Sequence, residues 1–152
     1  MIRIASFEHL LEKFRELDRA EVQIPAAFKF PMALKDYLAW VEPSGHRVYL
    51  LFEDQSSGEP MGIVFQRNNG AADTPAAMCQ WCHTVRPGPA VGLLTAAAGK
   101  NHRIGVHLCS TLNCRENKGK PGIHDMRESL GAHERLHEIL ERMSSFAHRN
   151  LF

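Results

Sequence analysis

Apolar residues near the amino end of the chain recur at helical spacing. Between residues 7 and 17 they stand mostly three or four positions apart, at Phe7, Leu10, Leu11, Phe14 and Leu17. Ser6 is placed as an N-cap and Glu8 lies in the first turn. The pattern therefore predicts an amphipathic helix whose apolar stripe faces the core. A second stripe predicts a short helix that ends before Pro43, and it consists of Leu34, Tyr37, Leu38 and Val41.

Strand-like runs occupy the middle of the chain. Residues 48–52 and 61–65 are two such runs, and the polar segment 53–60 between them predicts a hairpin loop. A polar linker is expected over residues 67–74. A second hairpin is predicted from residues 91–95 to 104–108, with its turn at Gly99-Lys100-Asn101.

The last part of the chain predicts one long helix after a break at Lys120-Pro121-Gly122. Its apolar stripe consists of Leu136, Ile139, Leu140, Met143 and Phe146. Helices, hairpins and a final helix in this order indicate an α+β fold. We divide the single domain 1–152 into a helical and hairpin region (1–74), a cysteine-bearing segment (75–120) and a C-terminal helix (121–152).

Composition and charge narrow the class of protein. With 152 residues and 44% hydrophobic content the chain can bury a core. It contains neither an apolar run of membrane-spanning length nor a secretory leader, so we expect it in the cytoplasm. Residues 1–78 hold 8 Lys/Arg against 11 Asp/Glu, whereas residues 79–152 hold 10 against 6. This mildly basic second half is compatible with RNA or an acidic partner, although nucleic-acid modules usually carry a stronger basic stripe.

Four cysteines form two pairs, Cys79-x-x-Cys82 and Cys109-x₄-Cys114, on either side of the second predicted hairpin. In a cytosolic chain such pairs indicate metal binding before disulfides. Four thiolates suit one tetrahedral zinc ion and leave no open position for catalysis. We expect Ser110 to cap a short helix that holds Cys114 in its first turns. A knuckle, a hairpin and a helix start sharing one zinc ion form a treble clef.

Other readings of these residues remain. An iron–sulfur cluster uses the same ligands. The run Cys79-Gln80-Trp81-Cys82-His83 matches the c-type haem attachment pattern, but that reading needs an exported chain and leaves Cys109 and Cys114 without a role. Several histidines are alternative ligands or bystanders: His83, His102, His107, His124, and the pair His133 and His137 on the last helix. No nucleophile–base pair or phosphate loop stands out, so we do not expect an enzyme.

The cysteine segment resembles a known family. The residues that carry the resemblance are Cys79-x-x-Cys82, Ile104-Gly105-Val106-His107-Leu108-Cys109 and Ser110-Thr111-Leu112-Asn113-Cys114. They are similar to the treble-clef domain of the elongation-factor-G-binding proteins, the family of the fusidic-acid-resistance proteins. Single-domain bacterial relatives look similar over nearly the whole chain, including Asp36-Tyr37-Leu38-Ala39-Trp40. The resistance proteins carry a separate helical N-terminal domain, whereas the segment before Cys79 here is shorter and contains its own predicted hairpin, so the resemblance is not extended to drug resistance.

The resemblance implies a structural zinc ion and a protein module that binds elongation factor G. The matching contact surface would be the knuckle and the hairpin tip, with Trp81, Lys100 and Arg103. The alternative for Trp81 is a core side chain that covers the zinc site, and for Lys100 and Arg103 it is an ordinary solvated turn. The alternative function is an RNA-binding zinc finger.

Overall fold

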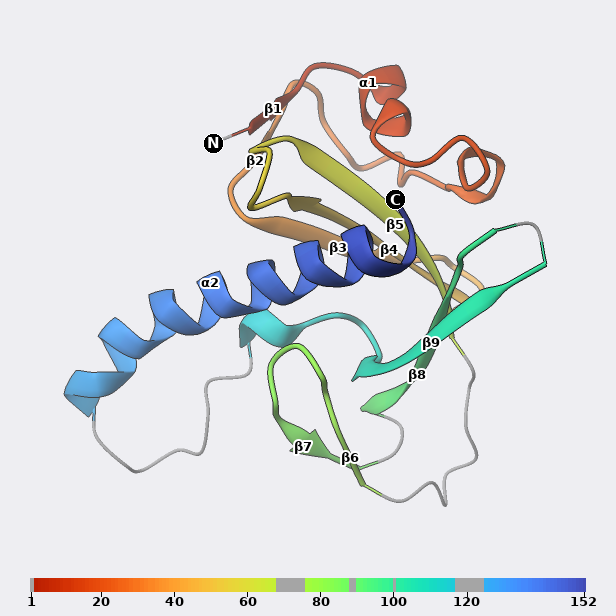
Figure 1. Ribbon diagram of the computed structural model, residues 1–152. Helices are drawn as coiled ribbons and strands as arrows, with labels where there is room; N and C mark the ends of the chain where they lie inside the picture. The colour runs from red at the N-terminus through yellow and green to blue at the C-terminus, as the bar shows by residue number, and fades with distance from the viewer. Residues whose placement is uncertain (1, 68–75, 88–89, 100, 117–124) are drawn as a thin grey trace.

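One five-stranded antiparallel sheet forms the centre of the molecule (Figure 1). The computed structural model of the chain describes residues 2–67, 76–87, 90–99, 101–116 and 125–152. The strands lie side by side in the order β3-β4-β5-β8-β9. Their bounds are Tyr37–Val41 (β3), Arg47–Glu53 (β4), Pro60–Arg67 (β5), Val91–Ala97 (β8) and Arg103–Cys109 (β9).

Both predicted hairpins are confirmed as neighbouring strand pairs. The β4–β5 pair runs in register from Arg47 opposite Gln66 to Glu53 opposite Pro60. The β8–β9 pair runs from Val91 opposite Cys109 to Ala97 opposite Arg103. The two hairpins are joined where Gln66 and Arg67 pair with Thr95 and Leu94. The predicted linker 67–74 begins with the last residue of β5, and the rest of it lies outside the described residues.

The helix expected around residues 34–41 is wrong, because residues 37–41 form the edge strand β3 paired with β4, and Leu34 ends the separate strand β2. The side chains of Tyr37, Ala39 and Val41 lie on one face of the sheet, and those of Leu38 and Trp40 lie on the other. Both faces of the strand are therefore packed, and apolar residues occur at consecutive positions. Such a run contains helical spacing by coincidence, because periodicity does not separate a doubly covered strand from a helix.

The N-terminal segment forms a short helix and a small two-stranded sheet. The helix α1 spans Phe7–Glu12, and the Ser6 side chain accepts a hydrogen bond from the His9 amide as the predicted N-cap. The helix ends before Phe14, which instead lies beside Gly62 in an isolated parallel bridge. The helix predicted to continue to residue 17 is therefore longer than α1, and Leu17 is exposed. The other elements here are β1 (Ile2–Ile4), β2 (Met32–Leu34) and the 3-10 helix η1 (Arg19–Glu21).

The sheet separates two groups of buried side chains. The smaller group, which we call the second cluster, lies under α1 and consists of Ile4, Leu10, Phe14, Leu34, Trp40, Tyr49, Leu51 and Val64. The larger group, the first cluster, lies on the other face of the sheet with the cysteines and the predicted stripe of the last helix, α2 (Asp125–Asn150). Its main members are Tyr37, Leu50, Phe52, Phe65, Cys79, Trp81, Leu108, Cys109, Leu112, Cys114, Ile139, Leu140 and Met143. Figure 1 shows α2 crossing the sheet with its first turns extending past the strands. Within the described residues, no helix is both long and apolar enough to cross a membrane.

Short elements complete the cysteine-bearing part of the chain. The strands β6 (Ala77–Met78) and β7 (Val85–Arg86) pair on either side of the first cysteine pair. The 3-10 helix η2 (Cys114–Glu116) begins at the last cysteine. The turn between β6 and β7, called the knuckle below, carries Cys79 and Cys82. Together with the β8–β9 hairpin and η2 it brings the cysteines to one place in the first cluster.

Candidate metal centre

The four cysteine sulfurs converge on one site. The Sγ atoms of Cys79, Cys82, Cys109 and Cys114 all lie within 4.8 Å of one another. Each sulfur has a close neighbour from the other pair, with Cys79 to Cys114 at 3.7 Å and Cys82 to Cys109 at 3.6 Å. These distances exceed the ~2.05 Å of a disulfide bond, so none of these four cysteines is joined to another by a disulfide.

The first pair lies in a knuckle between β6 and β7. The Cys79 amide donates to the Thr84 carbonyl at 3.0 Å, and the His83 amide donates to the Cys79 carbonyl at 2.8 Å. His83 adopts a φ of 61°, the left-handed conformation that reverses the chain after Cys82. The Gln80 amide donates to the His107 carbonyl of β9 at 2.9 Å, which holds the knuckle against the hairpin.

The second pair lies in the loop that follows β9. Cys109 is the last residue of the strand, and Cys114 is the first residue of η2. The helix expected to start at Ser110 is wrong, since the chain makes a turn there first. Leu112 adopts a φ of 54° and its amide donates to the Cys109 carbonyl at 2.9 Å. This turn uses the extra residues of the x₄ spacing to bring Cys114 back toward Cys109.

The donor set and its spacing fit one zinc ion. A tetrahedral ion with Zn–S bonds of about 2.3 Å places its sulfurs about 3.8 Å apart, close to the two shortest pairs here. Hydrogen bonds within the cluster, first from Cys109, lower the pKa of Cys82, and the contact with Cys109 raises the pKa of Cys114. Four sulfurs this close cannot all ionise without a cation, and a divalent ion removes that penalty.

Histidines are not part of this group. Among the described residues, the four cysteines form the one cluster of metal-ligating side chains. His83, His102 and His107 are exposed, as the alternation along β9 predicts for His107. His137 instead contacts Glu141 one turn along α2, with Nε2 to Oε1 at 3.0 Å. The candidate ligand His124 lies outside the described residues, as does the side chain of His133.

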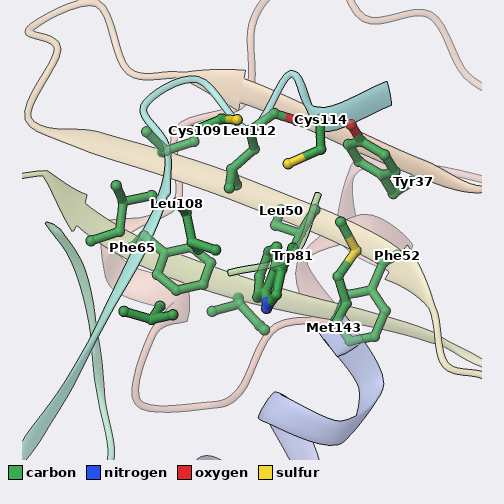
Figure 2. Close-up of a cluster of buried hydrophobic side chains, with 14 of the residues drawn as sticks. Tyr37, Leu50, Phe52, Phe65, Trp81, Leu108, Cys109, Leu112, Cys114 and Met143 are labelled. Carbon is green, nitrogen blue, oxygen red and sulfur yellow. Dashed lines mark hydrogen bonds between the residues drawn. The ribbon is translucent and has the colours of Figure 1, made fainter. Parts of the chain in front are cut away.

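Trp81 is a core residue in this structure and is not placed to contact a partner. Its side chain is 2% exposed, which fits the alternative of a core side chain better than a place on the contact surface. It packs edge-on against Phe65 of β5 and Phe146 of α2, with ring centroids 5.9 Å away in both cases. Figure 2 shows the indole inside the first cluster. The residue between the two knuckle cysteines thus anchors the site in the core.

Of the two basic candidates, the structure describes Arg103 alone, at the start of β9. Arg103 is exposed, and its guanidinium donates to the hydroxyl and carbonyl oxygens of Thr95 across the strand pair, at 3.1 and 2.8 Å. Lys100 lies outside the described residues. Arg103 stands six residues before Cys109 on β9, which places it roughly 20 Å along the strand from the cysteines.

Residues of the N-terminal half also contact the second cysteine loop, and sequence reasoning missed them. The Tyr37 hydroxyl donates to the Leu112 carbonyl and accepts from the Arg115 amide, both at 2.9 Å. Arg67 donates to the Ser110 carbonyl at 3.0 Å. These contacts join positions more than 40 residues apart, so local patterns contain no trace of them.

Comparison with known proteins agrees with this geometry. The family model "FBP C-terminal treble-clef zinc-finger" matches residues 11–149. The chain also resembles the solved structure of the fusidic acid resistance protein FusC, with a TM-score of 0.54 and 15% sequence identity. The alignment covers 88% of this chain and 59% of that one, so the chain spans about three fifths of that protein's length. At this identity the likeness shows a shared fold. A comparison with curated proteins found no match.

Proposed function

Because the chain belongs to the FBP C-terminal treble-clef zinc-finger family, we propose that it is a cytoplasmic, zinc-stabilised module that binds translation elongation factor G. The observation that carries the zinc part of this proposal is the convergence of four sulfurs from two loops on one point. Support for the partner comes from the family and from the fold shared with a fusidic acid resistance protein.

Zinc has a structural role in this proposal. Bound by Cys79, Cys82, Cys109 and Cys114, it would hold the knuckle to the loop after β9 and stabilise the folded state. Four protein sulfurs leave no coordination position for a substrate or a water molecule. We therefore propose a binding protein and not an enzyme.

The binding surface we propose is formed by exposed apolar side chains around the cysteines. Met78 of β6 and Val85 of β7 stand opposite each other and are 48% and 64% exposed. Leu93 of β8 is also exposed and pairs with the exposed His107 of β9. Apolar side chains flanked by polar ones are typical of protein-binding surfaces. This surface, defined as Met78, Val85, Leu93 and His107, replaces Trp81 as the expected contact.

Binding to purified elongation factor G, measured by titration calorimetry, tests the proposal. We expect Val85→Asp to weaken binding by about tenfold or more, because a charge in a desolvated contact is costly. The matched control is Leu17→Asp, which changes an exposed leucine in the segment that follows α1. Both variants should keep the wild-type zinc content and melting temperature.

Two results would contradict the proposal. The first is no binding of the zinc-loaded wild type to elongation factor G at micromolar concentration. The second is equal weakening by Val85→Asp and Leu17→Asp, which would show that elongation factor G does not bind at the surface around the cysteines. Binding to RNA that falls steeply with rising salt would instead favour the nucleic-acid alternative.

A further inference from the structure

We propose that Tyr37, a residue of the N-terminal half, is a positioning residue for the zinc site. It is not a ligand, and the cysteine loop that its hydroxyl contacts follows it by more than 70 residues. Its hydroxyl holds the loop that presents Cys109 and Cys114, so that metal affinity depends on β3 as well as on the zinc finger. The inference rests on the zinc site and not on binding to elongation factor G.

The loop between Cys109 and Cys114 makes a turn before η2. One backbone hydrogen bond, from the Leu112 amide to the Cys109 carbonyl, closes its turn. Leu112 adopts a left-handed φ of 54°, which costs free energy for a side chain with a Cβ atom. Without a metal ion to join the sulfurs, such a turn needs contacts from outside to keep its shape.

The Tyr37 hydroxyl supplies contacts on both sides of Cys114. It donates to the Leu112 carbonyl and accepts from the Arg115 amide, each at 2.9 Å. The second bond is made to a backbone amide in the first turn of η2, where amide groups generally need partners from outside the helix. Figure 2 shows the hydroxyl directed at the backbone beside Cys114. One hydroxyl thus fixes the two residues that determine where the Cys114 sulfur points.

Tyr37 is itself held firmly. The ring is 5% exposed and belongs to the first cluster. The Arg115 guanidinium lies over the ring, 4.4 Å from its centroid, and also bonds to Asp36 and to the Tyr37 carbonyl. Burial raises the pKa of Tyr37, so the hydroxyl keeps its proton for the bond to Leu112. The contact is therefore rigid on the side of β3.

The hydrogen bonds of Tyr37 contribute to the free energy of zinc binding if the loop becomes ordered together with the metal. Removing the Tyr37 hydroxyl would then lower the affinity for zinc. Partners that orient ligands in this way typically contribute 10- to 100-fold to metal affinity when they are removed by mutation. We expect a value near the lower end, because Tyr37 bonds to the backbone beside the ligands and not to a sulfur.

The test compares Tyr37→Phe with Tyr49→Phe. Both changes remove a buried tyrosine hydroxyl with two hydrogen-bond partners, but Tyr49 belongs to the second cluster and bonds to Glu21 and Glu42. Phe keeps the ring and its packing in both cases. The zinc Kd of each full-length variant is measured by competition with a chromogenic chelator, alongside the melting temperature and the visible spectrum of the cobalt-substituted protein.

We expect Tyr37→Phe to raise the zinc Kd about tenfold and Tyr49→Phe to change it less than twofold. Tyr37→Phe should also shift the cobalt d–d bands, because Cys114 moves, whereas Tyr49→Phe should leave them unchanged. A wild-type zinc Kd for Tyr37→Phe would overturn the proposal, even with a lowered melting temperature, since the hydroxyl would then be merely structural. Equal weakening by both variants would overturn it as well.

Discussion

Replacing Trp81 with alanine tests whether this residue is a core anchor or a partner contact. The indole lies between the two knuckle cysteines and is 2% exposed. It contacts Phe65 of the sheet and Phe146 of α2. Its removal therefore detaches the knuckle from both layers of the first cluster.

The contacts set the size of the effect. A buried tryptophan replaced by alanine costs about 3–5 kcal/mol, and the two edge-on ring contacts account for about 1–3 kcal/mol of that. Since a domain has about 5–15 kcal/mol of stability in total, the variant should fold but with a small margin. For a chain of this length the melting temperature should fall by roughly 6–20 °C.

Thermal unfolding and zinc transfer to a chelator measure the consequence, with Trp40→Ala as the control. Trp40 is also buried and packs against Phe14 and Phe28, but in the second cluster. We expect both variants to lose similar stability and Trp81→Ala alone to release zinc faster while still folded. If Trp81→Ala melts at the wild-type temperature and loses only binding to elongation factor G, the core placement is refuted.

Further changes test separate parts of the structure. Cys109→Ser should lose zinc and unfold at room temperature, because structural zinc contributes on the order of 10 kcal/mol; a folded, zinc-containing variant would contradict the site. Gly62→Ala should lower the free energy of unfolding by about 1–3 kcal/mol, since a Cβ atom there would lie 2.7 Å from the Phe14 ring; Phe14→Leu should relieve part of this loss, and strict additivity would refute the clash. His83→Gly should be tolerated and His83→Val should cost about 1–2 kcal/mol at its φ of 61°, as chemical denaturation will show; equal stability would count against the turn. Asp54→Asn should cost about 1–3 kcal/mol at pH 7.

The sign of the Asp54 effect follows from its pKa. Burial raises it, but hydrogen bonds from Ser57, His148 and Ser56 outweigh burial and lower the pKa below its usual value. A carboxyl whose pKa is lowered by folding stabilises the protein above its unfolded pKa of about 3.9 and loses that contribution as the pH falls through the folded value. Denaturation at pH 7 should therefore show the full difference between Asp54→Asn and wild type, and equal stabilities there would refute the network.

Sequence reasoning predicted the parts of the fold that depend on local patterns. The cysteine spacing led to the four residues that converge, and the strand runs led to β4, β5, β8 and β9. The stripe from Leu136 to Phe146 does face the first cluster. In each case the residues that create the pattern also make the contact, so the prediction did not depend on knowing contacts with residues far away in the sequence.

The failures arose where distant parts of the chain decide the structure. The sequence pattern of β3 predicts a helix because apolar residues cover both of its faces, one packed under α1 and the other in the first cluster. α1 stops early because Phe14 packs beside Gly62, far away in sequence. The residues next to Trp81 in the sequence do not indicate whether its side chain lies in the core or on the surface. The bonds from Tyr37 to the cysteine loop are of the same kind.

Zinc content of the natively purified protein, with thiol reactivity before and after chelation, tests the central claim most directly. We expect about one zinc ion per chain, and four thiols that react with a thiol reagent only after a chelator removes the metal. Cysteines that react freely in a metal-free, stably folded protein would contradict a structural zinc site, and iron in place of zinc would contradict the assigned metal.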